Sequence, residues 1–347
     1  MKRIAAWFMS ALLLALSLTG CSAGKTETED RGKSYFTYFD TVSFVYSYAG
    51  DSAEQFDRRS AGASGILGEY HRLFDIYHEY SGENNLCTLN RNAGGESIEV
   101  DRKLIDFLVY AKELYETTDG KMNVMMGSVL SIWHDLRTAA GDDPASARIP
   151  TDEELQTAGE HTDISSLEID EENCTVRISD PDASIDVGAL GKGYATEMAA
   201  RWLEADGALG YVLNVGGNIR IVGTKPDGSG WVTGVKDPAN TEKFAAKLML
   251  ADTSCVTSGS YERYYTVDGV CYHHIIDEAT LFPADYYSSL TVVIKDSALA
   301  DALSTALFCM PYEDGAALAE SLGAKVLWIF PDGEIRYTPG MEKLIAN

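Results

Sequence analysis

A run of closely spaced strand patterns in the second half of the chain constrains the fold most. The segment YVLNVGGNIRIVGTKPDGSGWVTGVKDP, residues 211–238, is typical of a strand, a Gly-Gly turn, a second strand, a long turn and a third strand. Strands joined by short turns pair antiparallel, because a parallel pair needs a long crossover connection. Further strand and turn patterns follow at 243–259, and a closing hairpin is predicted at 324–338. The sequence therefore predicts antiparallel sheets.

Helical patterns lie between these groups of strands. Apolar residues recur at helical spacing over 54–80 and over 101–118, where Asp101 is suited to a helix cap. Groups of strands separated by helices predict an α+β architecture. The remaining expected elements are a strand over 35–48, a turn and helix over 119–133, a connecting segment over 138–163, short strands at 166–170, 175–179 and 183–187, and a helix over 297–310.

The chain begins with a secretion signal. MKRIAAWFMSALLLALSLTGC has two basic residues, an apolar run and small residues before Cys21. This pattern resembles a bacterial lipobox and predicts a signal peptide over 1–20, lipidation of Cys21, a polar tether over 21–34 and one domain over 35–340. We then expect a protein anchored by lipid on the extracytoplasmic face of a bacterial cell membrane. An ordinary signal peptide or an uncleaved anchor are the alternatives.

The net charge of −25 limits the classes of ligand. Such an acidic surface argues against nucleic acid and against a polybasic membrane patch. An anionic ligand must therefore be held locally, by a metal ion, a lysine or backbone N–H groups.

A glycine-rich loop, DVGALGKGYATEMAA, leads into a predicted helix at 186–200. Glycines let the backbone approach a ligand, and a helix start offers free N–H groups. The familiar phosphate loop is excluded, because Asp186 and Gly193 stand where it needs a glycine and a Ser or Thr. From the loop alone, a ligand site and a tight turn are both open.

Two further groups could carry chemistry. Asp301 and Thr305 are four residues apart and share one helix face, where they could hold a cation that prefers oxygen, such as Mg²⁺. The alternatives are a helix cap and a packed threonine. His273 and His274 are adjacent, so on a strand only one of them would face a site.

Four ordered motifs resemble the ApbE family of bacterial flavin transferases. They are DVGALGKGYA, NVGGNIR, HHIIDEAT and ADALSTA, and the resemblance runs from about residue 36 to 338. The chain departs from the family pattern at several points: Phe39-Asp40 replaces Met-Gly, Asn123 and Asn218 each replace Asp, and Glu278 and Leu281 replace Pro and Gly.

The resemblance implies a fold and a reaction. The fold would be α+β and related to the T-fold, with antiparallel sheets, packed helices and FAD in a cleft between sub-lobes. The activity would be Mg²⁺-dependent transfer of FMN from FAD onto a Ser or Thr hydroxyl of a target protein, with release of AMP. The implied target is a membrane-associated redox subunit. Two alternatives are a Mg²⁺-dependent FAD pyrophosphatase and a flavin-binding lipoprotein without catalysis.

The resemblance also implies roles for individual residues. Asp301 and Thr305 match the metal-binding side chains, and Ala189 matches the position whose carbonyl completes that site. His274 or Asp301 would accept the hydroxyl proton. The positions that match FAD contacts are Phe39, Tyr77, Lys121, Met122, Asn123, Asp186, Lys192 and Ile275.

Overall fold

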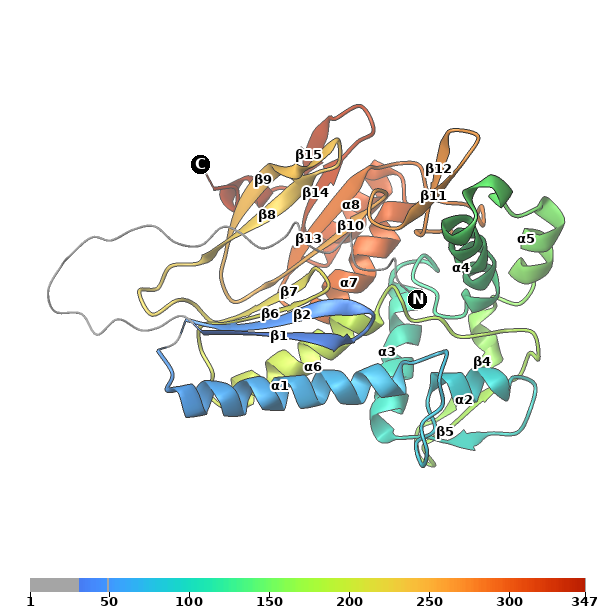
Figure 1. Ribbon diagram of the computed structural model, residues 1–347, viewed down its shortest axis with the longest axis horizontal. Helices are drawn as coiled ribbons and strands as arrows, with labels where there is room; N and C mark the ends of the chain where they lie inside the picture. Colours follow the sequence, from blue (N-terminus) through green and yellow to red (C-terminus); the bar gives the residue numbers. More distant parts are fainter. Residues whose placement is uncertain (1–30, 49, 347) are drawn as a thin grey trace, which may run out of the picture.

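The computed structural model describes residues 31–48 and 50–346. The expected signal peptide and Cys21 lie outside these residues. An eight-stranded sheet with the order β1-β2-β6-β7-β10-β13-β14-β15 forms the centre of the fold, and each pair of neighbours is antiparallel (Figure 1). Its strands are β1 (Arg31–Tyr38), β2 (Thr41–Ser47), β6 (Tyr211–Val215), β7 (Asn218–Val222), β10 (Ser254–Gly259), β13 (Ser289–Ile294), β14 (Lys325–Ile329) and β15 (Ile335–Tyr337).

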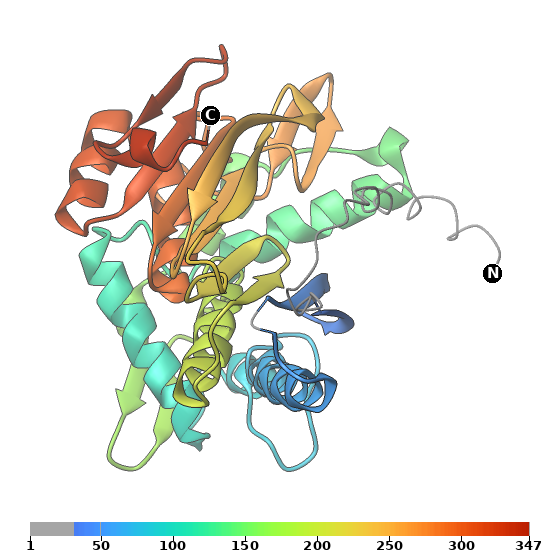
Figure 2. The ribbon, with the colours of Figure 1, turned by 90° about the vertical axis from the view of Figure 1, so that its left-hand side faces the viewer.

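Helices cover one face of this sheet. Leu213 and Val215 of β6 share a hydrophobic cluster with Leu67 of the long helix α1, and Trp328 of β14 shares another with Leu303. Figure 2 shows α1 nearly end-on, beneath the strands. The helices on this face are α1 (Ala53–Leu73), α6 (Gly191–Ala205), α7 (Ser297–Ala306), which continues into the short helix η3 (Leu307–Cys309), and α8 (Tyr312–Ser321).

A hairpin covers the opposite face. Strands β8 (Trp231–Asp237) and β9 (Asn240–Leu250) pair with each other and pack on the sheet in a third hydrophobic cluster. The C-terminal segment joins them, because Ile345 forms a bridge to Leu248 after the short helix η4 (Met341–Lys343). The folded unit therefore extends beyond the predicted end at 340.

A second lobe is built from the middle of the chain. Trp133 of α4 packs against the hairpin β11–β12 and against α5 in a separate hydrophobic cluster. The elements of this lobe are α4 (Gly127–Asp142), η1 (Pro144–Ser146), α5 (Asp152–Gly159), β11 (Tyr264–Val267) and β12 (Val270–His273). The intervening elements share the core of α1, α6 and β6: α2 (Leu86–Arg91), β3 (Ile98–Glu99), α3 (Arg102–Thr117), η2 (Ile164–Ser166), β4 (Leu167–Asp170) and β5 (Thr175–Ile178).

The predicted α+β class with antiparallel sheets is confirmed, and the Asp101 carboxylate caps α3 by accepting the Lys103 N–H. Four local predictions were wrong. The expected strand over 35–48 is the hairpin β1–β2, which already begins at Arg31 and so includes four residues assigned to the tether. The helix expected over 54–80 ends at Leu73, the connecting segment contains α5, and the expected strand at 183–187 forms one bridge only.

Within the described residues, no helix combines the length and the apolar character needed to cross a membrane.

Candidate functional site

Helices α6 and α7 touch where Gly193 faces Asp301. The Gly193 N–H donates to Oδ2 of Asp301 at 2.8 Å. A Cβ atom at Gly193 would lie 2.3 Å from the Asp301 Cβ and 2.5 Å from the Ser297 carbonyl oxygen. Only glycine fits this contact. Gly193 lies in the first turn of α6, whose N–H groups have no partner within the helix, so the Asp301 carboxylate satisfies one of these free donors.

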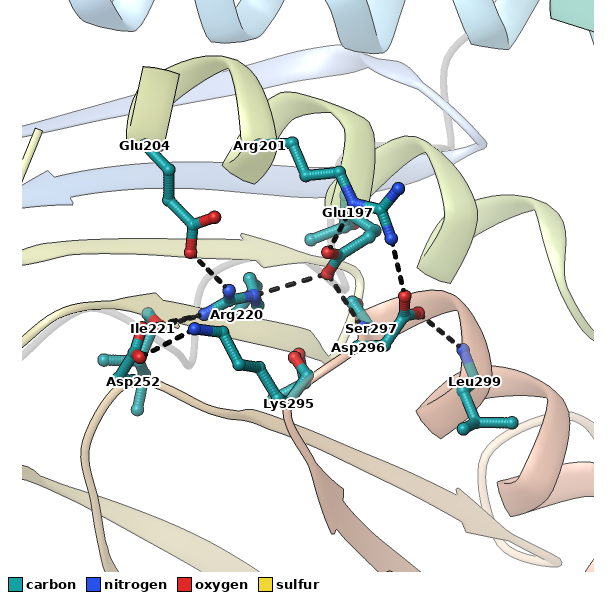
Figure 3. Close-up of polar contacts among 12 residues, drawn as sticks. Glu197, Arg201, Glu204, Arg220, Ile221, Asp252, Lys295, Asp296, Ser297 and Leu299 are labelled. Carbon is teal, nitrogen blue, oxygen red and sulfur yellow. Dashed lines mark hydrogen bonds and ion pairs between the residues drawn. The ribbon is translucent and has the colours of Figure 1, made fainter. Parts of the chain in front are cut away.

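A partly buried network of ion pairs fixes this contact (Figure 3). Glu197, one turn after Gly193 on α6, accepts from the Ser297 N–H at 2.9 Å, and it pairs with Arg201 and Arg220. The Arg220 side chain is fully buried in β7 and also pairs with Glu204 at 2.6 Å. At the start of α7, Asp296 caps the helix and pairs with Arg201. The first turn of α7, and with it Asp301, is thereby tied to α6.

The Asp301 carboxylate is unusual because it is buried and forms no ion pair with any described residue. Burial raises its pKa, whereas the charge of Lys192, the Gly193 N–H and the Asn218 side chain all favour its charged form. Asn218 is itself 1% exposed, and its Oδ1 atom has no partner in the described structure. Thr305 lies one turn beyond Asp301 and is half-buried. These groups offer oxygen atoms of the kind that Mg²⁺ prefers.

The glycine-rich loop folds back on itself beside this carboxylate. The Lys192 Nζ donates to the Gly188 carbonyl at 3.0 Å, and the Gly188 N–H donates to Oδ1 of Asp186 at 2.8 Å. Burial raises the pKa of Asp186, while the Gly188 N–H and the charges of His134 and Lys192 lower it. Lys192 therefore sits between two carboxylates, and its Nζ makes no ion pair with either of them.

The two adjacent histidines have separate environments, as their spacing predicts. His273 is buried and structural, because its Nε2 lies 2.8 Å from the Ala284 carbonyl and its Nδ1 accepts the Ile275 N–H. His274 has a buried Nδ1 without a partner. Burial first, and then the positive charges of Arg263, His273, Lys192 and Arg137, lower the pKa of His274 to about 3. It is thus neutral at pH 7.

This environment predicts a pH effect on stability. The ordinary pKa of histidine is 6.5, so between pH 6.5 and about 3 the unfolded chain binds a proton at His274 that the folded chain excludes. Stability from this residue is therefore lost as the pH falls below 6.5. Between pH 7 and pH 5, we expect the unfolding free energy of the wild type to fall by about 1–2 kcal/mol more than that of His274→Gln. Urea unfolding at both pH values measures this, and equal changes in the two proteins would contradict it.

Two aromatic residues were predicted to contact FAD: Tyr77, which lies near Asp186 of the glycine-rich loop, and Phe39, which lies in the β1–β2 turn. Tyr77 is 54% exposed and its ring lies 5.9 Å from that of His134 on α4. Partial burial first, and then the charge of Asp186, raise the pKa of Tyr77. Phe39 stacks edge-on against His71 at 5.5 Å. Phe39 and Asp40 both have positive φ, 53° and 50°, in the two-residue turn between β1 and β2. Tyr77 thus has an accessible face for a planar ligand.

The segment from Lys121 to Asn123 is occupied by protein contacts. Lys121 pairs with Asp277 at 2.7 Å, Met122 is 1% exposed, and the Asn123 amide donates to the Thr162 carbonyl and to Glu278. Any FAD contact by Met122 would have to use its backbone. The same holds for Ile275, which is 4% exposed.

Two departures from the family pattern touch each other here. The Asn123 Nδ2 lies 3.2 Å from Oε1 of Glu278, so an aspartate at 123 would meet a like charge.

A third departure affects the backbone. Leu281, which stands where the family has glycine, adopts a φ of +60°, a conformation that favours glycine.

Another group of possible metal ligands lies apart from this site in the sequence. In the part of the chain that the structure describes, ligand atoms of His161, Asp180 and Asp182 lie within 4.8 Å of one another. His161 and Asp180 already pair at 2.8 Å.

Sequence reasoning missed two residues that act on His274. Arg137 of α4 and Arg263, just before β11, both lower its pKa by their charge. Neither belongs to one of the four motifs, and the signal that could have drawn attention to them is their positive charge in an acidic chain.

Comparison with known proteins places this site in a family. The model of the ApbE family matches residues 41–328. The chain belongs to the ApbE family. That match spans α6 and α7 and includes all the predicted metal ligands. It also includes each predicted FAD contact except Phe39, which lies just before its start.

Members of the ApbE family resemble this chain in sequence and in structure. The FAD:protein FMN transferase of Treponema pallidum is 32% identical over 272 residues, which cover 74% of this chain and 73% of the relative. The ApbE protein of Thermotoga maritima has a TM-score of 0.80 at 27% identity and covers 92% of this chain and all of its own. The flavin transferase ApbE of Vibrio cholerae has a TM-score of 0.74 at 26% identity, covering 91% of this chain and 99% of its own.

Proposed function

We propose that this protein transfers the FMN part of FAD onto a Ser or Thr hydroxyl of a target protein and releases AMP. The observation that carries the proposal is the buried Asp301 carboxylate, which is held against Gly193 beside Lys192 and has no ion-pair partner among the described residues. A buried carboxylate without a counter-charge destabilises the folded protein unless a cation binds to it. The relatives described above are named for this transfer reaction.

The oxygen atoms at this site suit Mg²⁺. Asp301 would supply the carboxylate, Thr305 a hydroxyl on the same helix face, and Ala189, which directly precedes the N-cap of α6, a backbone carbonyl. Oxygen ligands of this kind, with few protein ligands in total, are typical of magnesium sites that also bind phosphate. When bound, the ion would neutralise negative charge on the phosphate oxygens as a Lewis acid.

The side chains around this site divide the remaining work. Lys192 lies at the start of α6, where its ammonium group and the nearby backbone N–H groups stabilise phosphate charge. His274 is neutral and accepts the proton of the attacking hydroxyl. Phosphate next to the ring would raise its lowered pKa, which makes it a stronger base when substrate is bound.

The atoms of the reaction balance without an added reagent. The acceptor oxygen forms a bond to the phosphorus of the FMN half, the bond from that phosphorus to the bridging oxygen breaks, and AMP leaves with the bridging oxygen. Water in place of the acceptor hydroxyl would give FMN and AMP, which is the pyrophosphatase reaction. Tyr77, with half of its surface exposed, is suited to stack on a ring of FAD.

An assay with and without an acceptor tests this function. The purified protein is incubated with FAD and MgCl₂, alone or with a candidate redox subunit, and AMP, free FMN and protein-bound flavin are measured. We expect AMP and protein-bound FMN in equal amounts only when the acceptor is present. Free FMN without acceptor would instead establish the pyrophosphatase, and bound FAD without AMP a non-catalytic flavin-binding protein.

We also propose a lipid anchor at Cys21 on the extracytoplasmic face of the membrane, with a membrane-associated redox subunit as the target. The support is the sequence before Cys21, which has basic, apolar and small residues in lipobox order. Labelling cells with a radioactive fatty acid should mark the wild type and leave Cys21→Ala unlabelled. Equal labelling of both would refute the anchor.

A further inference from the structure

Arg137 and Arg263 are the two described arginines whose guanidinium groups donate no hydrogen bond and form no ion pair. Every other arginine between 31 and 346 has at least one such partner. The chain has 53 acidic residues and a net charge of −25, so carboxylates are plentiful. These two arginines are therefore unpaired because of where they lie, and not because the chain lacks carboxylates.

The fold brings the two arginines to one place. Arg137 follows Trp133 by one turn of α4, and the Trp133 ring lies 6.4 Å from Tyr265 and 6.0 Å from Tyr272 on the hairpin β11–β12. Arg263 directly precedes that hairpin, and its carbonyl accepts the His274 N–H at 3.1 Å. Helix and hairpin therefore set both side chains near His274.

The electrostatics agree with this placement. Burial and the charge of Arg263 lower the pKa of Arg137, and both arginines, with Lys192, lower the pKa of His274. Three permanent positive charges thus act on one neutral ring. Positive charges that lie close together without a counter-charge repel each other and destabilise the folded protein. An anion bound between them would offset this repulsion.

We propose that Arg137 and Arg263 form a clamp that binds the pyrophosphate of FAD together with Lys192. This rests on the function proposed above. Guanidinium groups bind phosphate oxygens through two parallel N–H bonds, which a lysine cannot do. The two arginines come from α4 and from the residue just before β11, in the lobe opposite Asp301 of α7. The anion would therefore be held from both lobes, by the two arginines on one side and by Lys192 and the predicted metal ligands on the other.

Binding measurements on two substitutions test the clamp. Arg137→Gln and Arg263→Gln each remove one charge from a side chain that is not fully buried, and melting curves check that they fold. We expect each to weaken FAD binding roughly tenfold, measured by titration calorimetry, and the double variant to weaken it further. Riboflavin, which lacks phosphate, should bind all the proteins equally. Arg137→Lys and Arg263→Lys should fall between the wild type and the glutamine variants.

Arg102→Gln is the matched control. Arg102 is exposed on α3, where it pairs with Asp106, so the same loss of charge there should leave FAD affinity unchanged. The affinity of wild type for FAD should also fall with added KCl more steeply than that of the double variant. Wild-type FAD affinity in the double variant would overturn the clamp.

Inorganic pyrophosphate separates the clamp from the proposed reaction. If wild type binds FAD but transfers no FMN, the reaction is wrong while the affinities still decide the clamp. If wild type binds no FAD, the titration with pyrophosphate decides it: weaker binding in the double variant would support the clamp. Equal binding in both proteins, or no binding by wild type, would overturn it.

Discussion

Replacing Asp301 by alanine is expected to lower FAD turnover by about a hundredfold or more, because the substitution removes the carboxylate of the predicted metal site. The loss should appear as AMP release that no longer responds to added MgCl₂. The side chain is 5% exposed and its Oδ2 accepts the Gly193 N–H, so alanine also leaves a buried donor without a partner. That costs about 1–3 kcal/mol of stability.

Asp301→Asn separates these two effects. Asparagine keeps an oxygen atom that can accept the Gly193 N–H, so the fold should retain nearly all of its stability, while the neutral side chain is a much weaker metal ligand. We expect this variant to melt close to the wild type and to be almost inactive. Asp314→Asn, at an exposed position of α8, is the control for loss of charge. Full magnesium-dependent activity in Asp301→Asn would exclude Asp301 as a ligand.

The order of helices and strands could be predicted where the pattern was long and regular. The hairpin β6–β7 and helix α3, with its Asp101 cap, follow from local sequence. The turn within the expected strand over 35–48 was not predicted, because its two residues, Phe39 and Asp40, adopt positive φ although neither is a glycine. Strand β13 and helix α8 went unrecognised. β13, with the sequence SLTVVI, is buried along nearly its whole length between β10 and β14, and even Ser289 and Thr291 are buried, so its residues do not separate into an apolar and an exposed polar face.

The site was predictable only through the resemblance, since its parts come from distant segments. Gly193 and Asp301 are 108 residues apart, and nothing in either local pattern indicates that they touch. Arg137 and Arg263 were missed for the same reason: the packing of α4 on β11–β12 brings them together. Local sequence suggested which residues have suitable chemistry, whereas the tertiary contacts determine which of them face each other.

The network around Arg220 explains how two helices can keep so close a contact. Arg220 is fully buried and is neutralised by Glu197 and Glu204, both on α6. Glu197 also holds the first N–H of α7 through Ser297. Breaking a buried ion pair on one side leaves the other charge unpaired, which is strongly unfavourable. These ion pairs and the Glu197–Ser297 hydrogen bond therefore fix the spacing of α6 and α7. The helices cannot easily move apart to accommodate a larger side chain at Gly193.

For this reason, the single methyl group added by Gly193→Ala is expected to lower FAD turnover by roughly a hundredfold, an effect typical of a displacement of about 1 Å in a catalytic group. The new Cβ would lie 2.3 Å from the Asp301 Cβ, so the carboxylate must shift or α6 must tilt. Stability should fall by about 1–3 kcal/mol, as for other overpacked contacts. AMP release and thermal melting measure the two effects on the same preparation.

Gly65→Ala provides the matched comparison. Gly65 lies in the middle of α1, where an added Cβ meets nothing within 4 Å, so alanine should stabilise the helix by roughly 0.5–1 kcal/mol and leave activity unchanged. Suppose instead that Gly193→Ala lost stability but kept the wild-type rate. The α6–α7 contact would then serve the fold alone, and Asp301 would not depend on it for its position. A loss of rate well beyond the loss of stability, with Gly65→Ala fully active, would place Gly193 among the residues that position the carboxylate.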